Sequence, residues 1–216
     1  MRMVIAVDGP SGAGKSTVAK LVAAKLGIEY IDTGAMYRAV ALHLLRAGTD
    51  ITDAEAVLAA LSALTIDLDG GRTMLNGEDV SGPIRTPEVT AFASKTSALA
   101  PVREKLVALQ RRMGAEKSVI LDGRDIGTNV FPDTEFKFFV TASPEVRAKR
   151  RFDEMTEKGG APDFAEVQGA INKRDYDDMH RALNPLRQAD DAALIVTDEM
   201  DAEQVAGRIV EAVVRK

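Results

Sequence analysis

Eight residues near the start of the chain constrain its fold more than any other stretch. They are Gly9, Pro10, Ser11, Gly12, Ala13, Gly14, Lys15 and Ser16, and they fit the pattern G-x-x-x-x-G-K-[ST] between an apolar run, 3–7, and a helical pattern, 16–26. The glycines let backbone N–H groups converge on phosphates, and the helix that follows directs its positive end to the same point. The pattern predicts a nucleoside triphosphate site, with Lys15 between the β- and γ-phosphates and the Ser16 hydroxyl on Mg²⁺.

Apolar runs of strand length alternate with helical patterns along the rest of the chain. The strand candidates are 3–7, 28–31, 118–121, 136–140 and 193–196. This alternation is typical of an α/β fold, a five-stranded parallel sheet flanked by helices. The pieces TIDL and TMLN, joined by Asp69, Gly70 and Gly71, break the alternation and predict an inserted antiparallel hairpin. With 216 residues, 45% of them hydrophobic, we expect one domain with an insertion.

Composition excludes several classes of function. The net charge of −5 provides no overall field for nucleic acid or an anionic membrane, and no run of 18 apolar residues occurs. The chain has no cysteine and only two histidines, His43 and His180, which we interpret as packing or surface residues. We therefore expect a cytoplasmic protein whose anionic ligands are bound locally.

Arginines occur where ligands of such sheets bind. A strand ends at Ile31-Asp32, and we expect Thr33 to cap a helix that carries Arg38 in its first turns. Another strand ends at Asp122, a candidate partner for Mg²⁺ through water, and is followed by Gly123, Arg124 and Asp125. Several arginines converging on one cleft would suit a kinase whose acceptor is itself phosphorylated. For any single arginine, a surface ion pair remains the alternative.

A basic stripe follows in SPEVRAKRRFDEM. Ser143 is a predicted helix cap before Pro144, and Arg147, Arg150 and Arg151 have the spacing of one helix face. Because the glycine-containing segment 156–163 comes next, we interpret this region as a flap that closes over ATP. The alternative is local pairing with Glu154 and other acids.

The stretch KRDYDDMHRALNP, 173–185, is unusually charged. If it is helical up to Asn184-Pro185, then Arg174, Asp178 and Arg181 share one face. Asp175 and Asp177 would point elsewhere and stay solvated. The alternative for the whole segment is the solvated face of a helix.

Five motifs together, GPSGAGKST, DTGAMYRAV, GEDVSGPIRTPEV, LDGRDIGTNVFPD and RDYDDMHRALNPL, closely resemble the bacterial cytidylate kinase family. The resemblance runs in order from about residue 3 to residue 215. It implies transfer of the γ-phosphoryl group of ATP to CMP or dCMP, with Mg²⁺, by a P-loop nucleoside monophosphate (NMP) kinase core. It also implies core segments at 1–35, 106–146 and 169–216, an NMP-binding region at 36–105 with the hairpin near 64–81, and a lid at 147–168.

The resemblance also implies roles for individual residues. The ATP site would be Gly9 to Thr17, and the CMP site would be Thr33, Arg38, Ser94, Arg103, Arg124, Asp125, Arg174, Asp178 and Arg181. Within that set, Ser94, Arg103 and Asp125 would contact the cytosine, Arg174 and Asp178 the pentose, and Arg38, Arg124 and Arg181 the acceptor phosphate. The catalytic residues would be Lys15, Arg124 and the lid arginines Arg147, Arg150 and Arg151.

Two departures from the family pattern are visible, Asn129 in place of an apolar residue and Thr33 in place of serine. The role of Asp32 is left open.

The expected partners are ATP and CMP or dCMP, with no nucleic acid and no membrane, and the expected state is a monomer. Two alternatives stay open. One is a kinase for another acceptor, such as UMP or a metabolite that is not a nucleotide. The other is a nucleotide-dependent switch or motor subunit.

Overall fold

The computed structural model describes residues 2–215, which form two compact units. The first unit comprises the chain up to Tyr30 and from Lys117 onward, and the second comprises Ile31–Glu116. The second unit contains the whole predicted range 36–105. No helix among residues 2–215 has the length and apolar character that crossing a membrane would require.

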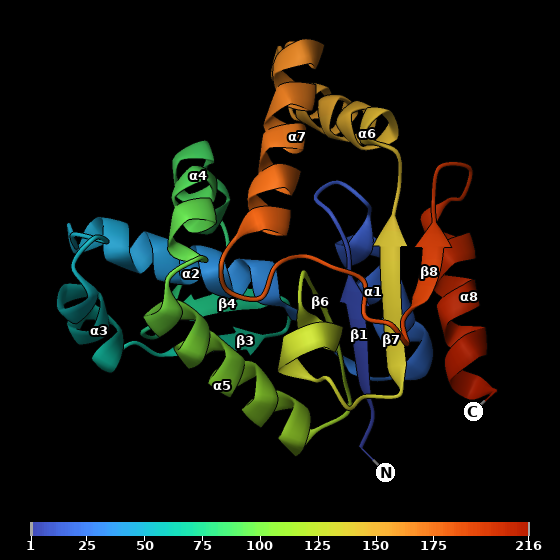
Figure 1. Ribbon diagram of the computed structural model, residues 1–216, viewed down its shortest axis with the longest axis horizontal. Helices are drawn as coiled ribbons and strands as arrows, with labels where there is room; N and C mark the ends of the chain where they lie inside the picture. The colour runs from blue at the N-terminus through green and yellow to red at the C-terminus, as the bar shows by residue number, and fades with distance from the viewer. Residues whose placement is uncertain (1, 216) are drawn as a thin grey trace. The chain divides into compact units, whose positions relative to one another are not determined.

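The first unit contains the five-stranded sheet (Figure 1). Its strand order is β2-β6-β1-β7-β8, and the pairs β1–β6, β1–β7 and β7–β8 are parallel. The predicted parallel sheet is confirmed. The strands are β1 (Val4–Asp8), β2 (Glu29–Asp32, which crosses into the second unit), β6 (Val119–Gly123), β7 (Phe136–Thr141) and β8 (Ala193–Val196). The helical elements are α1 (Lys15–Leu26), the π-helical turn η2 (Ile126–Val130), α6 (Pro144–Glu157), α7 (Phe164–His180) and α8 (Ala202–Val214).

Strand β1 lies in the middle of this sheet because its residues are apolar on both faces. Ile5, Ala6 and Val7 are fully buried between the neighbouring strands and the helices. The main core cluster joins Ile5 and Val7 to α1 and α8, which pack against each other. Each large aliphatic side chain buried in this way contributes about 1.5–3 kcal/mol to the stability of the fold. The loop that follows β1 is therefore attached to a stable part of the core.

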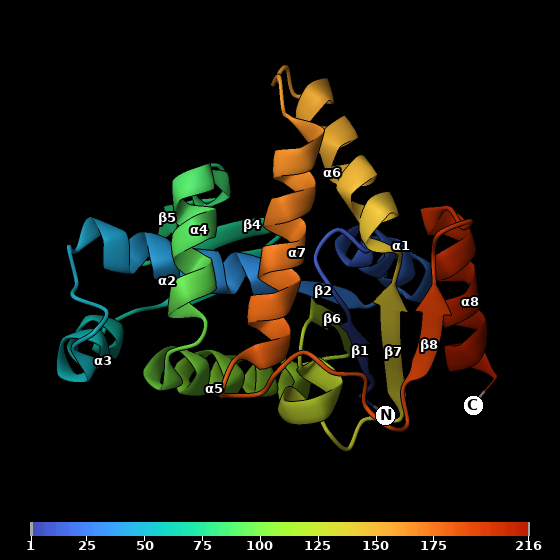
Figure 2. The ribbon, with the colours of Figure 1, turned by 45° about the horizontal axis from the view of Figure 1, so that its top comes forward.

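Helices α6 and α7 form an antiparallel pair joined by the short segment 158–163 (Figures 1 and 2). Ser143 caps α6 by accepting the N–H of Val146, as predicted, and Asp163 caps α7 by accepting the N–H of Glu166. A small apolar cluster of Ala148, Val167 and Ile171 holds the two helices together.

The second unit has its own sheet and helices. Its three-stranded sheet has the order β3-β4-β5, with both pairs antiparallel, and α2 packs against α4. The elements are α2 (Thr33–Arg46), α3 (Ala54–Ser62), β3 (Ile66–Asp69), β4 (Arg72–Leu75), β5 (Glu78–Asp79), the 3-10 turn η1 (Pro83–Arg85), α4 (Pro87–Thr96) and α5 (Ala100–Glu116). The predicted hairpin is β3–β4, and the two-residue strand β5 extends it.

Two local predictions were wrong. Asp32, not Thr33, caps α2, because the Asp32 carboxylate accepts the N–H of Ala35 at 2.7 Å. Helix α7 ends at His180, so Arg181 lies beyond it in an extended conformation and not on its face. The chain then turns through Asn184, which has a φ of 50°.

Gly9 is the glycine that the fold requires most strictly. Its φ is +149°, and a Cβ atom would lie 1.9 Å from the carbonyl oxygen of Val140. Gly27 also has a positive φ, +64°, but its added Cβ would meet nothing within 4 Å. Gly27→Ala should therefore cost about 1 kcal/mol of unfolding free energy through backbone strain alone. Gly9→Ala should cost about 2 kcal/mol more, because the β1–β7 backbones must also separate.

Urea unfolding of both variants measures the difference. Equal losses of stability in the two variants would show that the close approach of Gly9 to Val140 is unimportant.

Candidate active site

The predicted phosphate loop runs from the end of β1 to the start of α1. Gly12 and Gly14 have φ values of +77° and +83°, and Gly14 is the residue before α1. These left-handed conformations wind the backbone tightly, and they favour glycine because other residues are strained there. The geometry is the one that the sequence motif predicts, a tightly wound loop followed directly by the N-terminus of a helix.

Lys15 is buried, with 5% of its surface exposed, and its Nζ donates to the carbonyl oxygen of Pro10 at 2.7 Å. Burial lowers the pKa of Lys15 well below its ordinary value, and the nearby charge of Arg124 lowers it further. The carboxylates of Asp122, Asp8 and Asp178 act in the opposite direction. Lys15 therefore lies within electrostatic reach of Arg124 and Asp178, and a bound phosphate would stabilise its charged form.

Ser16 and Asp122 lie together as a magnesium site would require. The Ser16 hydroxyl donates to Oδ2 of Asp122 at 2.7 Å, and the Tyr30 hydroxyl donates to Oδ1 at 2.8 Å. Within residues 2–215 no group of three or more His, Cys, Asp or Glu side chains could enclose a metal. Mg²⁺ binds through few protein oxygens, with phosphates and water completing its octahedron. The hydroxyl and carboxylate present here fit that requirement.

Two ion pairs bring four predicted acceptor-site residues together. Arg124 Nε donates to Asp178 Oδ2 at 2.7 Å, and Arg181 Nη2 donates to Asp125 Oδ1 at 3.0 Å. Arg124 also donates from Nη1 to the carbonyl of Gly123, and Arg181 from Nε to that of Asn184. Each arginine thus keeps one terminal amino group without a hydrogen bond to residues 2–215. That amino group is available for an anionic ligand.

The charges around Asp178 fix its ionisation. Burial raises the pKa of Asp178, but Arg124, through its charge and its hydrogen bond, and the charges of Arg174 and Arg181 lower it more. The net pKa lies below the ordinary aspartate value. Arg174, half-buried on α7, therefore belongs to the same electrostatic cluster.

Asn129, a departure from the family pattern, has a structural role. Its Nδ2 donates to Oδ2 of Asp125 at 3.0 Å while Arg181 binds Oδ1. Both oxygens of Asp125 are thereby oriented. An apolar residue at position 129 would remove the hydrogen bond to Oδ2.

Asp8 links the phosphate loop to the segment that carries Arg124 and Asp125. Its two carboxylate oxygens accept the backbone N–H groups of Ile126 and Gly127 at 2.8 and 2.7 Å. Burial raises the pKa of Asp8 to about 6, against the lowering effect of those two hydrogen bonds. The charge of Asp125 raises this pKa further, and the charge of Lys15 lowers it.

The three predicted lid arginines have different partners. Arg147 is 4% exposed and pairs with Asp175. Arg150 donates to the hydroxyl and the carbonyl of Thr197 at 3.0 and 2.6 Å. Arg151 pairs with Glu154 on the exposed side of α6, as the alternative interpretation held. In this conformation the three guanidinium groups do not converge.

In the second unit, Asp32 organises the start of α2. Besides capping the helix, it lies 3.5 Å from Nη2 of Arg38 and 3.7 Å from Nη2 of Arg85. A Cβ atom on Gly34 would lie 3.2 Å from Nη1 of Arg38, so the guanidinium folds over the first turn of the helix. Thr33 is buried beside it. A helix N-terminus with two arginines is a favourable environment for a phosphate.

Ser94 and Arg103, also in the second unit, lie on α4 and α5. Arg103 is 3% exposed, donates to the carbonyl of Ser97 at 3.3 Å and stacks over the ring of Tyr37 at 5.8 Å. Ser94 is half-buried. Spacing alone could not have identified this pair, because α4 and α5 have the pattern of ordinary amphipathic helices.

The two histidines are packing and surface residues, as predicted. His43 Nε2 lies 2.9 Å from the carbonyl oxygen of Ala60, and His180 stacks on the exposed ring of Tyr176 at 4.0 Å between centroids.

Sequence reasoning missed Asp8, Tyr30, Arg85 and Asp175. Asp8 ends β1, whereas Tyr30 lies within β2, and only the proximity of Asp8 to the glycine loop could have drawn attention to either. Arg85 is part of the GEDVSGPIRTPEV motif but was assigned no role. Asp175 was predicted to be solvated and is instead 8% exposed, whereas Asp177 pairs with Lys173 on the surface as expected.

The fold and this cluster define a class, the phosphate-loop proteins, here with a second cationic site beside the loop. Among solved structures, an uncharacterised protein from Eubacterium ventriosum is similar in fold, with a TM-score of 0.58 and 11% identity over 100% of both chains. The family described as cytidylate kinase matches residues 5–215. A cytidylate kinase of Lactobacillus johnsonii is 48% identical, covering 99% of this chain and 95% of its own. A cytidylate kinase of Caldanaerobacter subterraneus is 48% identical, covering 97% and 93%. The chain belongs to the cytidylate kinase family.

The raised pKa of Asp8 makes a prediction about two backbone amides. Above pH 6 the ionised Asp8 carboxylate accepts both backbone N–H groups. Below pH 6 one carboxyl oxygen carries a proton, so the hydrogen bond that this oxygen accepts is weaker. Without nucleotide, the ¹⁵N–¹H signals of Ile126 and Gly127 should therefore titrate with a midpoint at the Asp8 pKa of about 6. In Asp8→Asn this transition should disappear.

The Ser143 amide provides an internal control. It donates to Asp198, whose pKa is lowered by the Ser143 hydrogen bonds, so its signal should change only below the ordinary aspartate range. A transition near pH 6 that persists in Asp8→Asn would assign it to another group.

Proposed function

We propose that this protein transfers the γ-phosphoryl group of ATP to the 5′-phosphate of CMP or dCMP and produces ADP and CDP or dCDP. The observation that supports this most is that helix α7 contacts both sites: Asp175 accepts from the Ser11 N–H of the phosphate loop, and Asp178 accepts from Arg124. The helix therefore connects the phosphate loop to a pair of acceptor-site residues. A triphosphate bound at the loop and a phosphorylated acceptor bound at Arg124 would then be neighbours.

Transfer would proceed in line, with the acceptor phosphate oxygen as the nucleophile. Near neutral pH that oxygen is already largely ionised, so no general base is needed. The chain's contribution is to position the two phosphates and to neutralise their charge. Lys15 would contact the transferred group, and the available amino groups of Arg124 and Arg181 would contact the acceptor phosphate.

Mg²⁺ would be held by the Ser16 hydroxyl and, through water, by Asp122. When bound it would neutralise the β- and γ-phosphate oxygens. Gly9–Thr17 would bind the triphosphate, and Arg150 and Arg151 would act from the lid, 147–168, on closure. Arg150 is now bound to the neutral Thr197, and Arg151 is paired with the exposed Glu154. Both contacts are weak enough for lid closure to replace them with contacts to ATP.

The resemblance also assigns residues of the second unit to the acceptor. Arg38 at the start of α2, with Thr33 beside it and Arg85 near it, forms a cationic group that would suit a phosphate. Arg174 and Asp178 would contact the pentose. The predicted NMP-binding region, 36–105, and the surrounding core segments are part of this proposal.

Ser94, Arg103 and Asp125 would recognise cytosine. Cytosine presents an amino donor beside the acceptors N3 and O2. A carboxylate oxygen can accept from the amino group, and a guanidinium can donate to the two acceptors. Asn129 and Arg181 orient Asp125 in a way that suits this role. Uracil would place a carbonyl against that carboxylate and leave a buried acceptor without a donor.

We further propose that the enzyme acts as a monomer in the cytoplasm, in pyrimidine nucleotide metabolism.

Initial rates with different acceptors test the specificity. With MgATP and equal concentrations of CMP, dCMP, UMP and AMP, CMP and dCMP should react fastest. UMP should be slower by roughly 5- to 150-fold, because an unpaired buried acceptor costs about 1–3 kcal/mol. A preference for UMP would contradict the recognition of the amino group. No stimulation of ADP formation by any monophosphate would favour a switch or motor.

Removal of the Lys15 charge tests its role in transfer. Lys15→Ala should lower kcat by about 100-fold or more, as expected when a donor to a developing charge is lost. The melting temperature should not fall, because burial already disfavours the lysine charge. Lys25→Ala, on the exposed side of the same helix, is the control and should keep wild-type kcat. Wild-type kcat in Lys15→Ala would refute the assignment.

A further inference from the structure

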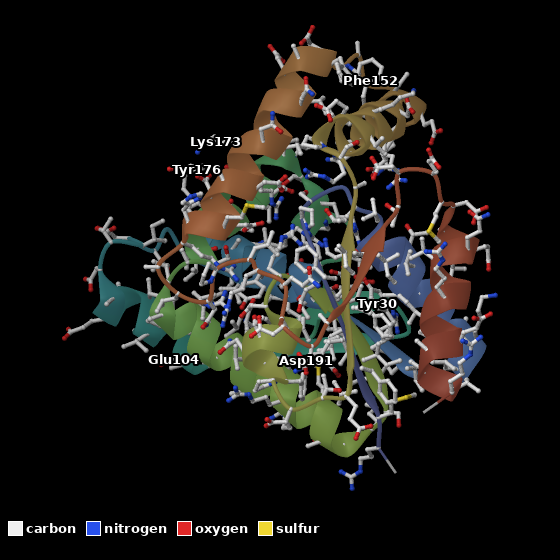
Figure 3. All side chains as sticks on the ribbon, turned by 45° about the vertical axis from the view of Figure 1, so that its right-hand side comes forward. Tyr30, Glu104, Phe152, Lys173, Tyr176 and Asp191 are labelled. Carbon is white, nitrogen blue, oxygen red and sulfur yellow. The ribbon has the colours of Figure 1, made fainter. Side chains whose placement is uncertain are left out.

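Asp175 is a buried carboxylate, although the next two positions of its helix are exposed. It is 8% exposed, whereas Tyr176 is 63% exposed and Asp177 also faces solvent. Lys173 and Tyr176 lie on the side of α7 that faces away from α6 (Figure 3). Since burying a charge is costly unless it is paired and hydrogen-bonded, Asp175 requires specific partners.

Those partners are Arg147 and the phosphate loop. Oδ2 of Asp175 accepts from Nη1 of Arg147 at 2.5 Å, and Oδ1 accepts the backbone N–H of Ser11 at 3.3 Å. Nη1 of Arg147 also donates to the carbonyl oxygen of Ser11 at 3.0 Å. The two hydrogen-bonding groups of the Ser11 backbone are therefore both occupied by one buried ion pair.

The same ion pair is anchored at its other end. Arg147 Nε donates to the carbonyl oxygen of Ala142, at the end of β7, at 2.9 Å. Gly12 packs so closely on Arg147 that a Cβ atom would lie 3.1 Å from the arginine Cβ. The first half of the loop is thus fixed to β7, α6 and α7 while its second half continues into α1.

We propose that Asp175, acting with Arg147, is a positioning residue for the ATP site. The pair holds the Ser11 peptide so that the following N–H groups of the loop face the triphosphate before ATP arrives. Because a preformed loop loses less conformational entropy on binding, this should increase ATP affinity without contact between Asp175 and ATP. Asp178, three residues later on α7, pairs with Arg124 in the acceptor site. Helix α7 therefore contributes one aspartate, Asp175, to the positioning of the ATP loop and another, Asp178, to the acceptor site.

The inference rests on the proposed function, so binding and turnover are measured separately. Wild type, Asp175→Asn, Asp178→Asn and Asp177→Asn are compared by calorimetric titration with MgATP alone and with CMP alone, and by steady-state KM for each substrate. Asp177→Asn changes only an exposed pair with Lys173 and is the matched control.

Asp175→Asn should weaken MgATP binding and raise KM for ATP by about tenfold, equivalent to about 1.4 kcal/mol, and leave the Kd for CMP within about twofold. Asp178→Asn should weaken CMP binding and leave the Kd for MgATP within about twofold. Asp177→Asn should bind both substrates with wild-type affinity. A purely structural role for Asp175 would weaken both substrates together and would overturn the proposal. Tighter MgATP binding in Asp175→Asn would also overturn it, by showing that the carboxylate competes with phosphate.

Asp175→Asn leaves Arg147 buried without a full counter-charge and can destabilise the fold. Arg147→Met with Asp175→Leu replaces both members, a change that buried pairs often tolerate. This double variant should fold, bind CMP like wild type and bind MgATP more weakly. Wild-type affinity for MgATP in the double variant would refute the positioning role. A wild type that binds MgATP and CMP but makes no CDP would contradict the proposed function and leave the binding result valid.

Discussion

The arginines that we propose for the acceptor phosphate are paired with carboxylates in the protein itself. Arg124 pairs with Asp178 and Arg181 with Asp125. Arg147, which supports the phosphate loop, pairs in the same way with Asp175. A buried arginine without an anion would be costly, and several together would repel one another. Each carboxylate removes that cost and fixes its arginine at one angle, so the cations are in place before a substrate binds.

The fold supplies these pairs because parallel strands end at one edge. β1 and β6, adjacent in the sheet, end in the phosphate loop and in the segment of Arg124. Asp8 joins the two by accepting from Ile126 and Gly127. A shift of either loop would therefore be transmitted to the other. Such rigid support is what charge neutralisation in a transition state requires, since donors that are already oriented need no rearrangement.

Patterns within one segment could be predicted, and contacts between segments could not. The strands and the phosphate loop were predicted within one or two residues because apolar runs and glycines act locally. The burial of Asp175 could not be predicted, because its partners Arg147 and Ser11 are 28 and 164 residues away in sequence. The end of α7 was misplaced because Pro185 suggested a later stop than the chain takes at His180.

The resemblance to a family identified candidate site residues that spacing and periodicity could not, above all Ser94 and Arg103. It did not give Asp8 or Asp175, whose roles follow only from hydrogen bonds to the backbone of distant loops. The strand β5 escaped prediction since two residues carry no periodicity.

The central claim is that the cationic site is formed before the substrates bind. A crystal structure with CMP and a non-hydrolysable ATP analogue bound, compared with one of the free enzyme, tests it most directly. The account predicts that Arg124–Asp178 and Arg181–Asp125 persist, with the acceptor phosphate on the remaining amino groups of the two arginines. Rupture of both pairs on binding, or a CMP phosphate bound away from Arg124 and Arg181, would contradict it.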